Sequence, residues 1–308
     1  METIAQFKSR EIVDTIEPTL GAFLPLLEAN RTTIEEIPRE TFQYGPTDRH
    51  QLDVYYPITS STTGKTQILV WVYGGGFVSG ERRLPAPANL GYATVGSFFA
   101  HRGFIVIIPD YRLAPSTIFP GAAEDVRDAI FWVIKNPQHL TTPTTPSPDT
   151  RNIFLMGHSA GAAHAFASLL LPPTSESAMQ LSSIAGLILH AGIHLWENFD
   201  LSNPFFEIVA QHYGGAEYVN QKSSLGLLRS ASAATLAALP RMLLVVAEKE
   251  PEWILEVNKD FEKVLETSTG KKPASLVALG HNHISPNWAV SSGQGESWAE
   301  DVIAWIRG

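Results

Sequence analysis

Short runs of apolar, largely β-branched residues recur along the chain, and most are bounded by Gly, Pro or charged residues. A continuous apolar run of this length is typical of a strand covered on both faces, as in a parallel sheet, although a buried helix segment is the alternative for any single run. We therefore predict six buried strands. The runs cover residues 67–73, 103–111, 151–157, 184–192, 241–248 and 274–280.

Between these runs the apolar residues recur with helical spacing, most clearly in residues 121–136, 253–270 and 297–308. Strand and helix therefore alternate along the chain, which predicts an α/β fold with a mainly parallel sheet. Two earlier segments, residues 40–45 and 51–57, alternate apolar and polar side chains. This pattern predicts two antiparallel strands at one edge, which brings the expected sheet to eight strands.

Two regions do not follow the alternation, because residues 1 to about 40 and 193 to about 239 have helical patterns and no strand. Each could fold over one end of the sheet as a lid. We predict a single domain over residues 1–308, with a core of about 41–192 and 240–308 and a helical cap made by the other two segments.

The composition narrows the class of protein. The 308 residues carry a net charge of -9, which argues against binding to nucleic acid or to an anionic membrane surface. There is no cysteine, so thiol catalysis and thiolate metal sites are excluded. The N-terminus has scattered charges and does not resemble a signal peptide, and no apolar run reaches the roughly 18 residues of a membrane span. We expect a soluble cytoplasmic protein.

A serine between two glycines follows one of the predicted strands, in the segment Gly157–Gly161, which reads GHSAG. This matches Gly-x-Ser-x-Gly, in which a sharp strand-to-helix turn raises the serine oxygen above the sheet and leaves no room for side chains at the flanking positions. The predicted nucleophile is Ser159. The alternative is that Ser159 only caps the following helix.

A second stretch, residues 71–80, reads WVYGGGFVSG and follows another predicted strand. Three consecutive glycines let the backbone approach a reacting carbonyl group, so that N–H groups can stabilise an oxygen that becomes negative. The alternatives are a plain flexible turn and a phosphate-binding loop, but the latter lacks its Gly-Lys-Ser/Thr ending.

A third stretch, residues 109–126, reads PDYRLAPSTIFPGAAEDV, and we interpret Asp110 and Arg112 in it as a structural pair that holds the loops. Together, YGGGF, DYRLAP with FPGAAED, and GHSAG resemble the α/β-hydrolases of the hormone-sensitive-lipase type, which include many microbial and fungal carboxylesterases and arylacetamide-deacetylase-like enzymes. The resemblance extends from about residue 45 to the C-terminus.

The resemblance implies an oxyanion hole made by the backbone N–H groups of Gly75, Gly76 and Ala160. It also implies a helical cap built from the N-terminus and from an insertion after the sixth strand, where the two irregular regions lie. Tyr73 stands where this family usually has a histidine that orients the glycine loop, so we expect different hydrogen bonding in that loop.

The chain order on this fold is serine, acid, histidine, so the base should follow the last strand. His281 and His283 lie there, and the family pattern Gly-x-x-His favours His283. A His-x-His zinc site is the alternative, and we predict no metal.

The acid should follow the seventh strand, where three glutamates lie. The family pattern Ala-Glu-x-Asp-Pro places Glu250 at the acid position, whereas Glu248 and Glu252 are the other candidates. The simpler interpretation is that all three are solvated charges, and it is the one we favour for Glu252.

The resemblance and these residues predict a serine carboxylesterase for small, fairly apolar esters, which acts through an acyl-enzyme and needs no cofactor. The alternatives are an amidase, formamidase, lactonase or secondary-metabolite tailoring enzyme with the same three residues. A non-enzymatic small-molecule receptor is disfavoured because His283 is kept.

Phe77, Trp196 and His158 are the predicted substrate contacts, and we also considered other aromatic residues for the pocket, namely Phe98, Phe99, Phe199, Phe205 and Phe206. A homodimer is possible, as related proteins often pair through the last strand and helix.

Overall fold

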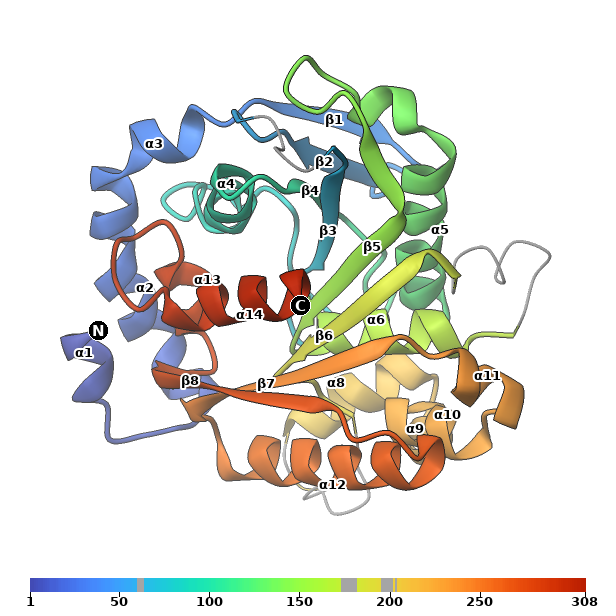
Figure 1. Ribbon diagram of the computed structural model, residues 1–308. Helices are drawn as coiled ribbons and strands as arrows, with labels where there is room; N and C mark the ends of the chain where they lie inside the picture. The colour runs from blue at the N-terminus through green and yellow to red at the C-terminus, as the bar shows by residue number, and fades with distance from the viewer. Residues whose placement is uncertain (60–63, 173–181, 195–201, 203) are drawn as a thin grey trace.

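Eight strands form one sheet in the order β1-β2-β4-β3-β5-β6-β7-β8 (Figure 1). The computed structural model describes residues 1–59, 64–172, 182–194, 202 and 204–308. The strands are β1 (Arg39–Gln43), β2 (Gln51–Tyr55), β3 (Thr66–Val72), β4 (Ile105–Pro109), β5 (Pro148–His158), β6 (Ile184–His190), β7 (Arg241–Lys249) and β8 (Ala274–Asn282).

The sheet is mainly parallel, as the apolar runs predict. β2 pairs antiparallel with both β1 and β4, whereas the six strands β4, β3, β5, β6, β7 and β8 run parallel to one another. The fold class inferred from the sequence, an α/β-hydrolase fold with eight strands, is therefore confirmed. The carboxyl ends of the parallel strands all meet at one edge of the sheet, which is where sites form in such folds.

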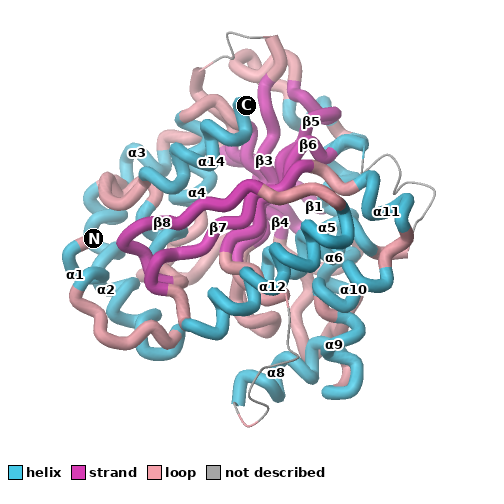
Figure 2. The backbone as a smooth tube through the Cα atoms, turned by 60° about the horizontal axis from the view of Figure 1, so that its bottom comes forward, coloured by secondary structure: helices cyan, strands magenta, loops and turns pink. Residues whose placement is uncertain are grey.

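Helices cover both faces of the sheet (Figures 1 and 2). α4 and α14 lie on one face, and α5, α6 and α12 lie on the other. The helices of the described residues are α1 (Glu2–Ala5), α2 (Ile12–Ala29), α3 (Arg31–Glu35), α4 (Ala93–His101), α5 (Gly121–Lys135), the 3-10 turn η1 (Pro137–Leu140), α6 (Ala160–Leu170), α8 (Pro204–Tyr213), the 3-10 turn η2 (Ala216–Tyr218), α9 (Val219–Lys222), α10 (Ser224–Ser230), α11 (Ala233–Ala238), α12 (Glu252–Thr269), α13 (Ser285–Ala289) and α14 (Ser297–Arg307).

The apolar stripes predicted on the helices are the ones that pack against the sheet. On α5, Val126, Ile130 and Val133 are fully buried. α12 buries Phe261 and ends before Gly270, which adopts φ +68° in the left-handed region that glycine favours. The central strands are buried on both faces, which explains why their sequences show no polar alternation.

The two irregular regions are helical where the structure describes them. α1 and α2 lie next to the ends of β7 and β8, where the Lys249 Nζ donates to the carbonyl groups of Ile4 and Ala5. α8 to α11 gather beside α6 and α12 (Figure 1). The division into a core and a cap stays a prediction. In the described ranges, no helix is both long and apolar enough to cross a membrane.

Substitutions in α2 test how firmly this helix packs on the core. Phe23 is 1% exposed and Val13 on the same helix is 82% exposed. Phe23→Ala should lower the free energy of unfolding by about 3–5 kcal/mol because it leaves a cavity, whereas Val13→Ala should change it by less than about 0.5 kcal/mol. Urea denaturation measures both. Equal stability of the two variants would contradict the packing of α2.

Candidate active site

Ser159 stands on the sharp turn between β5 and α6. Its φ of +55° lies in the left-handed region, which is costly for a residue with a side chain. The two flanking glycines are required by sterics. A Cβ at Gly157 would lie 2.5 Å from the carbonyl oxygen of Gly161, and a Cβ at Gly161 would lie 2.2 Å from the carbonyl oxygen of Tyr73.

The side chain of Ser159 does not cap α6, although its residue occupies the N-cap position. Instead its Oγ lies 3.0 Å from Nε2 of His283. The backbone N–H of Ser159 donates to the carbonyl group of His190 at 2.9 Å. The serine is therefore held from below by β6 and is hydrogen-bonded to an imidazole above the sheet.

A buried carboxylate completes a chain of three side chains. His283 Nδ1 lies 2.7 Å from Oε2 of Glu250, and the other oxygen of Glu250 accepts the N–H of Ala247 at 3.2 Å. Because a carboxylate only accepts, Nδ1 carries the proton and Nε2 is left to accept from Ser159. Exposure is 5% for Ser159, 2% for His283 and 0% for Glu250, so water screens these contacts weakly.

The competing candidates lie elsewhere. His281 Nε2 donates to the carbonyl group of Gly295, and its Nδ1 lies 2.9 Å from the Ser285 hydroxyl. Glu248 accepts the N–H of Gly280 at 2.7 Å, and Glu252 is exposed at the start of α12. Of these candidates, the structure therefore joins His283 to Ser159 and Glu250 to His283.

The glycine loop lies directly against the serine. A Cβ at Gly74 would lie 3.0 Å from the Cβ of Ser159. Gly75 and Gly76 have φ values of +139° and +59°, which side chains rarely adopt. Among the described residues, no protein acceptor is found for the N–H groups of Gly75, Gly76 and Ala160. Gly75 and Gly76 directly follow the glycine that packs on Ser159, and Ala160 directly follows Ser159.

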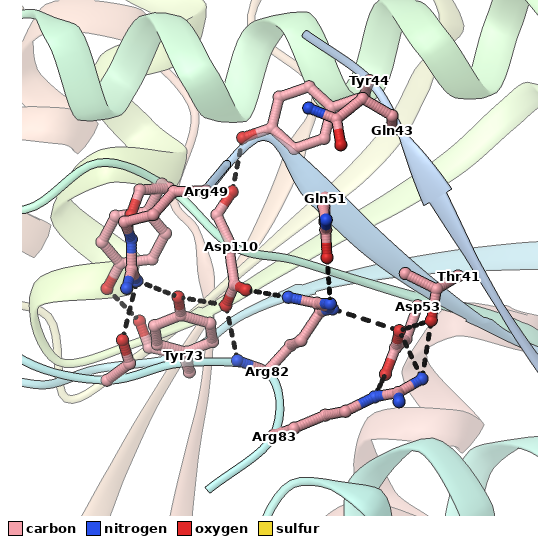
Figure 3. Close-up of polar contacts among 12 residues, drawn as sticks. Thr41, Gln43, Tyr44, Arg49, Gln51, Asp53, Tyr73, Arg82, Arg83 and Asp110 are labelled. Atoms are coloured by element: carbon pink, nitrogen blue, oxygen red, sulfur yellow. Dashed lines mark hydrogen bonds and ion pairs between the residues drawn. The ribbon is translucent and has the colours of Figure 1, made fainter. Parts of the chain in front are cut away.

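Tyr73 anchors this loop from inside the protein (Figure 3). Its hydroxyl donates to Oδ1 of Asp110 at 2.7 Å, and its carbonyl group accepts the hydroxyl of Tyr111 at 2.8 Å. The rings of Tyr92 and Tyr111 stack on its ring with centroid distances of 5.3 and 4.8 Å. Burial, followed by the charge of Asp110, holds the pKa of the Tyr73 hydroxyl well above its ordinary value, so it stays a donor.

Asp110 is paired with Arg82, which corrects the expectation that Asp110 and Arg112 form a pair. The backbone N–H of Arg82 donates to Asp110, and its guanidinium group contacts Asp110 and Gln51 and lies 3.1 Å from Asp53 (Figure 3). Arg112 instead holds Asp125, with Nη2 at 2.6 Å from Oδ1. Asp110 and Arg112 lie close together in the sequence, but Asp110 pairs with Arg82 and Arg112 pairs with Asp125 of α5.

An apolar cluster borders the serine on the side of α8. It joins Phe77 and Ala160 with Phe205 and Phe206 of α8. The Phe77 ring stacks on His212 with a centroid distance of 4.3 Å, whereas Phe98 and Phe99 belong to the main core under the sheet. Trp196 and Phe199 lie outside the described residues, so their part in a pocket stays a prediction.

Four histidines outside the Ser159–His283–Glu250 chain are buried and neutral. Burial lowers the pKa of His190, His194 and His212 to about 3, and that of His281 to about 4. His194 lies apart from the site, with its ring stacked on Phe261. No group of three or more possible metal ligands occurs among the described residues.

The family model described as BD-FAE matches residues 52–181. The chain is 28% identical over 212 residues to a probable isoprenylcysteine alpha-carbonyl methylesterase of Oryza sativa subsp. japonica, an alignment of 65% of this chain and 46% of that protein. It is 31% identical over 144 residues to Carboxylesterase 20 of Arabidopsis thaliana, which covers 45% of this chain and 42% of that protein. The chain thus spans about half the length of these relatives.

The solved structure of an esterase from Pyrobaculum calidifontis superposes with a TM-score of 0.68 at 19% identity, over 97% of this chain and 96% of that chain. The chain has the α/β-hydrolase fold. The α/β-hydrolase fold accounts for the strand order, for the serine at the end of β5, and for the glutamate and histidine that follow β7 and β8.

Removing the Tyr73 hydroxyl tests whether its hydrogen bond to Asp110 fixes the conformation of the glycine loop in this protein. Tyr73→Phe leaves the buried Asp110 with one donor fewer, so the free energy of unfolding should fall by about 1–3 kcal/mol and kcat should fall as well. Tyr56→Phe is the matched control, because it loses one hydrogen bond to the carbonyl group of His139 far from the glycine loop. Denaturation and ester hydrolysis measure both properties. Equal kcat in Tyr73→Phe and wild type would contradict the role of this network.

The buried imidazoles predict acid sensitivity. The folded protein keeps His190, His194, His212 and His281 neutral, whereas the unfolded chain protonates them near pH 6.5. The free energy of unfolding is therefore unaffected by these imidazoles above that pH, and it decreases as the pH falls toward 3. At pH 5 each such imidazole costs about 2 kcal/mol. The melting temperature should drop steeply below pH 6, and less steeply in His194→Met. A melting temperature that stays constant from pH 7.5 to 5 would contradict this.

Proposed function

We propose that this protein is a serine carboxylesterase that hydrolyses small, fairly apolar carboxylic esters through an acyl-enzyme on Ser159. The observation that carries the proposal is the continuous chain from Ser159 Oγ to His283 Nε2, at 3.0 Å, and from His283 Nδ1 to Glu250, at 2.7 Å. The similarity to a carboxylesterase and to a probable methylesterase supports the same conclusion.

The acylation step uses this chain directly. Ser159 Oγ attacks the ester carbonyl carbon while His283 Nε2 takes its proton. Glu250 accepts from Nδ1 throughout, so it fixes the ring and stabilises the imidazolium that forms. The imidazolium then gives its proton to the alkoxide leaving group, which departs as the alcohol and leaves an acyl ester on Ser159.

The tetrahedral intermediate needs donors for its negative oxygen. We propose that the N–H groups of Gly75, Gly76 and Ala160 supply them, because Gly74 of the same loop packs on Ser159, Ala160 follows the serine, and no protein acceptor is found for the three N–H groups in the described ranges. Ala160 is the first residue of α6, so the helix dipole adds to the effect. Losing one donor of this kind costs about 3 kcal/mol of transition-state stabilisation.

Deacylation repeats the chemistry with water in place of the serine. His283 Nε2 takes a proton from water, the resulting hydroxide adds to the acyl carbon, and the C–O bond to Ser159 breaks as the serine oxygen recovers the proton. The products are the carboxylic acid and the enzyme in its starting state. Every step uses side chains, backbone N–H groups and water, so the proposed reaction requires no cofactor.

The surroundings of the serine favour a neutral, modest-sized substrate. The cluster on the α8 side is apolar, and Phe77 in it is 1% exposed. The Phe205 ring comes within 3.2 Å of the position that a Cβ at Gly76 would occupy, so little room remains above the glycine loop. An amide or lactone could meet the same residues. The cap segments, a homodimer and a cytoplasmic location stay predictions from the sequence.

Replacing the serine tests the proposal. Ser159→Ala should abolish hydrolysis of short-chain nitrophenyl esters, because no other group takes over as nucleophile. Ser168→Ala is a matched control, since that buried hydroxyl lies on the same helix and donates to the carbonyl group of Ala165. Turnover is followed across esters, anilides and lactones. Undiminished ester turnover in Ser159→Ala would refute the proposal, and turnover of anilides or lactones alone would replace the ester by that substrate class.

A further inference from the structure

His158 directly precedes the serine and packs on the ring of the base, and it takes no part in the proton transfer described above. It is the last residue of β5 and stands opposite His190, the last residue of β6. Its side chain is 5% exposed. The sequence indicated a substrate contact for this residue, but the contact it makes in the structure is with the segment that carries His283.

The ring of His158 is hydrogen-bonded to the backbone of the base. Its Nε2 lies 2.9 Å from the carbonyl oxygen of His283. A carbonyl oxygen can only accept, so Nε2 carries the proton and His158 is the donor. The two rings also pack together, with centroids 4.8 Å apart and planes tilted by 38°. His158 thus joins the residue beside the nucleophile to the main chain of the base.

The neighbours of His158 keep it uncharged. Burial, followed by the charges of His283 and His190, holds the pKa of His158 well below its ordinary value. On the β6 side the His190 ring lies 5.0 Å away, edge to face. On the other side the glycine loop packs on it, because a Cβ at Gly74 would lie 3.1 Å from His158 Nδ1. A neutral donor can fix His283 without repelling the imidazolium that His283 becomes.

The rest of the base loop is held to other elements. The Asn282 side chain accepts the N–H groups of Ile284 and Ser285 and donates to the Thr19 hydroxyl of α2. These contacts fix the flanks of the loop relative to α2 and α13. The hydrogen bond from His158 links the backbone of His283 directly to β5, the strand that ends beside Ser159.

We propose that His158 is a positioning residue that sets the distance between Ser159 Oγ and His283 Nε2 by binding the backbone carbonyl group of His283. This inference rests on the proposed esterase function, because its consequence is measured on proton transfer between those two side chains. A shift of the base by a fraction of an ångström weakens that transfer, while the pocket that binds the substrate is unchanged.

The test compares four variants by kcat, KM and melting temperature with the ester that the wild type turns over best. His158→Met removes the donor at similar length, so kcat should fall on the order of 10- to 100-fold with little change in KM. His158→Gln should restore most of kcat, because its amide nitrogen reaches as far as Nε2. His158→Asn is one methylene shorter and should stay impaired. His194→Met replaces a buried histidine stacked on Phe261, and its kcat should equal that of wild type.

Each result decides the matter. A wild-type kcat in His158→Met overturns the inference, as does a rise in KM alone, which indicates a substrate contact instead. Should His158→Met fail to fold, Gln and Asn give the same comparison, and an equal kcat in these two overturns the inference. If the wild type hydrolyses no ester at all, the proposed function fails first, and the positioning role falls with it.

Discussion

The hydrogen bond between Ser159 Oγ and His283 Nε2 joins residues that are 124 positions apart in the sequence. The serine follows β5 and the histidine follows β8, and the strands β6 and β7 lie between them. Neighbouring strands are about 4.8 Å apart, so the loop after β8 must reach back across roughly 14 Å of sheet. A contact of 3.0 Å over that span depends on the register of the whole parallel half of the sheet.

Charged side chains and neutral polar side chains lie on different sides of this hydrogen bond. On the β2 and β4 side, the buried carboxylates Asp53, Asp110 and Asp125 are each paired with arginine, and this pairing offsets the cost of removing them from water. Asp110 also accepts from the hydroxyl of Tyr73, which directly precedes the three glycines of the glycine loop. Around His283 the neighbouring imidazoles are uncharged, so Glu250 is the anion that faces the base. The ion pair of Asp110 with Arg82 therefore lies next to the glycine loop, whose N–H groups we propose as oxyanion donors. The proposed proton transfer from Ser159 to His283 takes place beside the uncharged imidazole rings of His158 and His190.

The sequence predicted the strands and helices because these elements depend on local patterns of apolar and polar residues. The apolar runs marked the strands, and the helical stripes marked α5 and α12. The predicted positions of Ser159, Glu250 and His283 followed from chain order on the fold together with family patterns, and the structure brings these three together. The glycines at 157 and 161 could be predicted because a sharp turn excludes side chains wherever it occurs.

The remaining features depend on contacts between distant segments. Asp110 and Arg112 lie two residues apart in one loop, yet their partners are Arg82 and Asp125. His158 was predicted from its place in the serine motif as a substrate contact, and nothing local shows that its ring reaches a carbonyl group 125 residues away. Likewise, Tyr73 marked a departure from the family pattern, whereas its hydroxyl contact with Asp110 follows from how β3 and β4 pack.

Labelling with a fluorophosphonate tests the central claim most directly, because the probe reports an activated oxygen without requiring knowledge of the substrate. Peptide mapping by mass spectrometry should find a single phosphonylated residue, Ser159. Glu250→Gln keeps the shape of the acid but favours the wrong tautomer of His283, so labelling should slow by a factor on the order of a thousand or more. An adduct on another residue, or wild-type labelling rates in Glu250→Gln, would contradict the account.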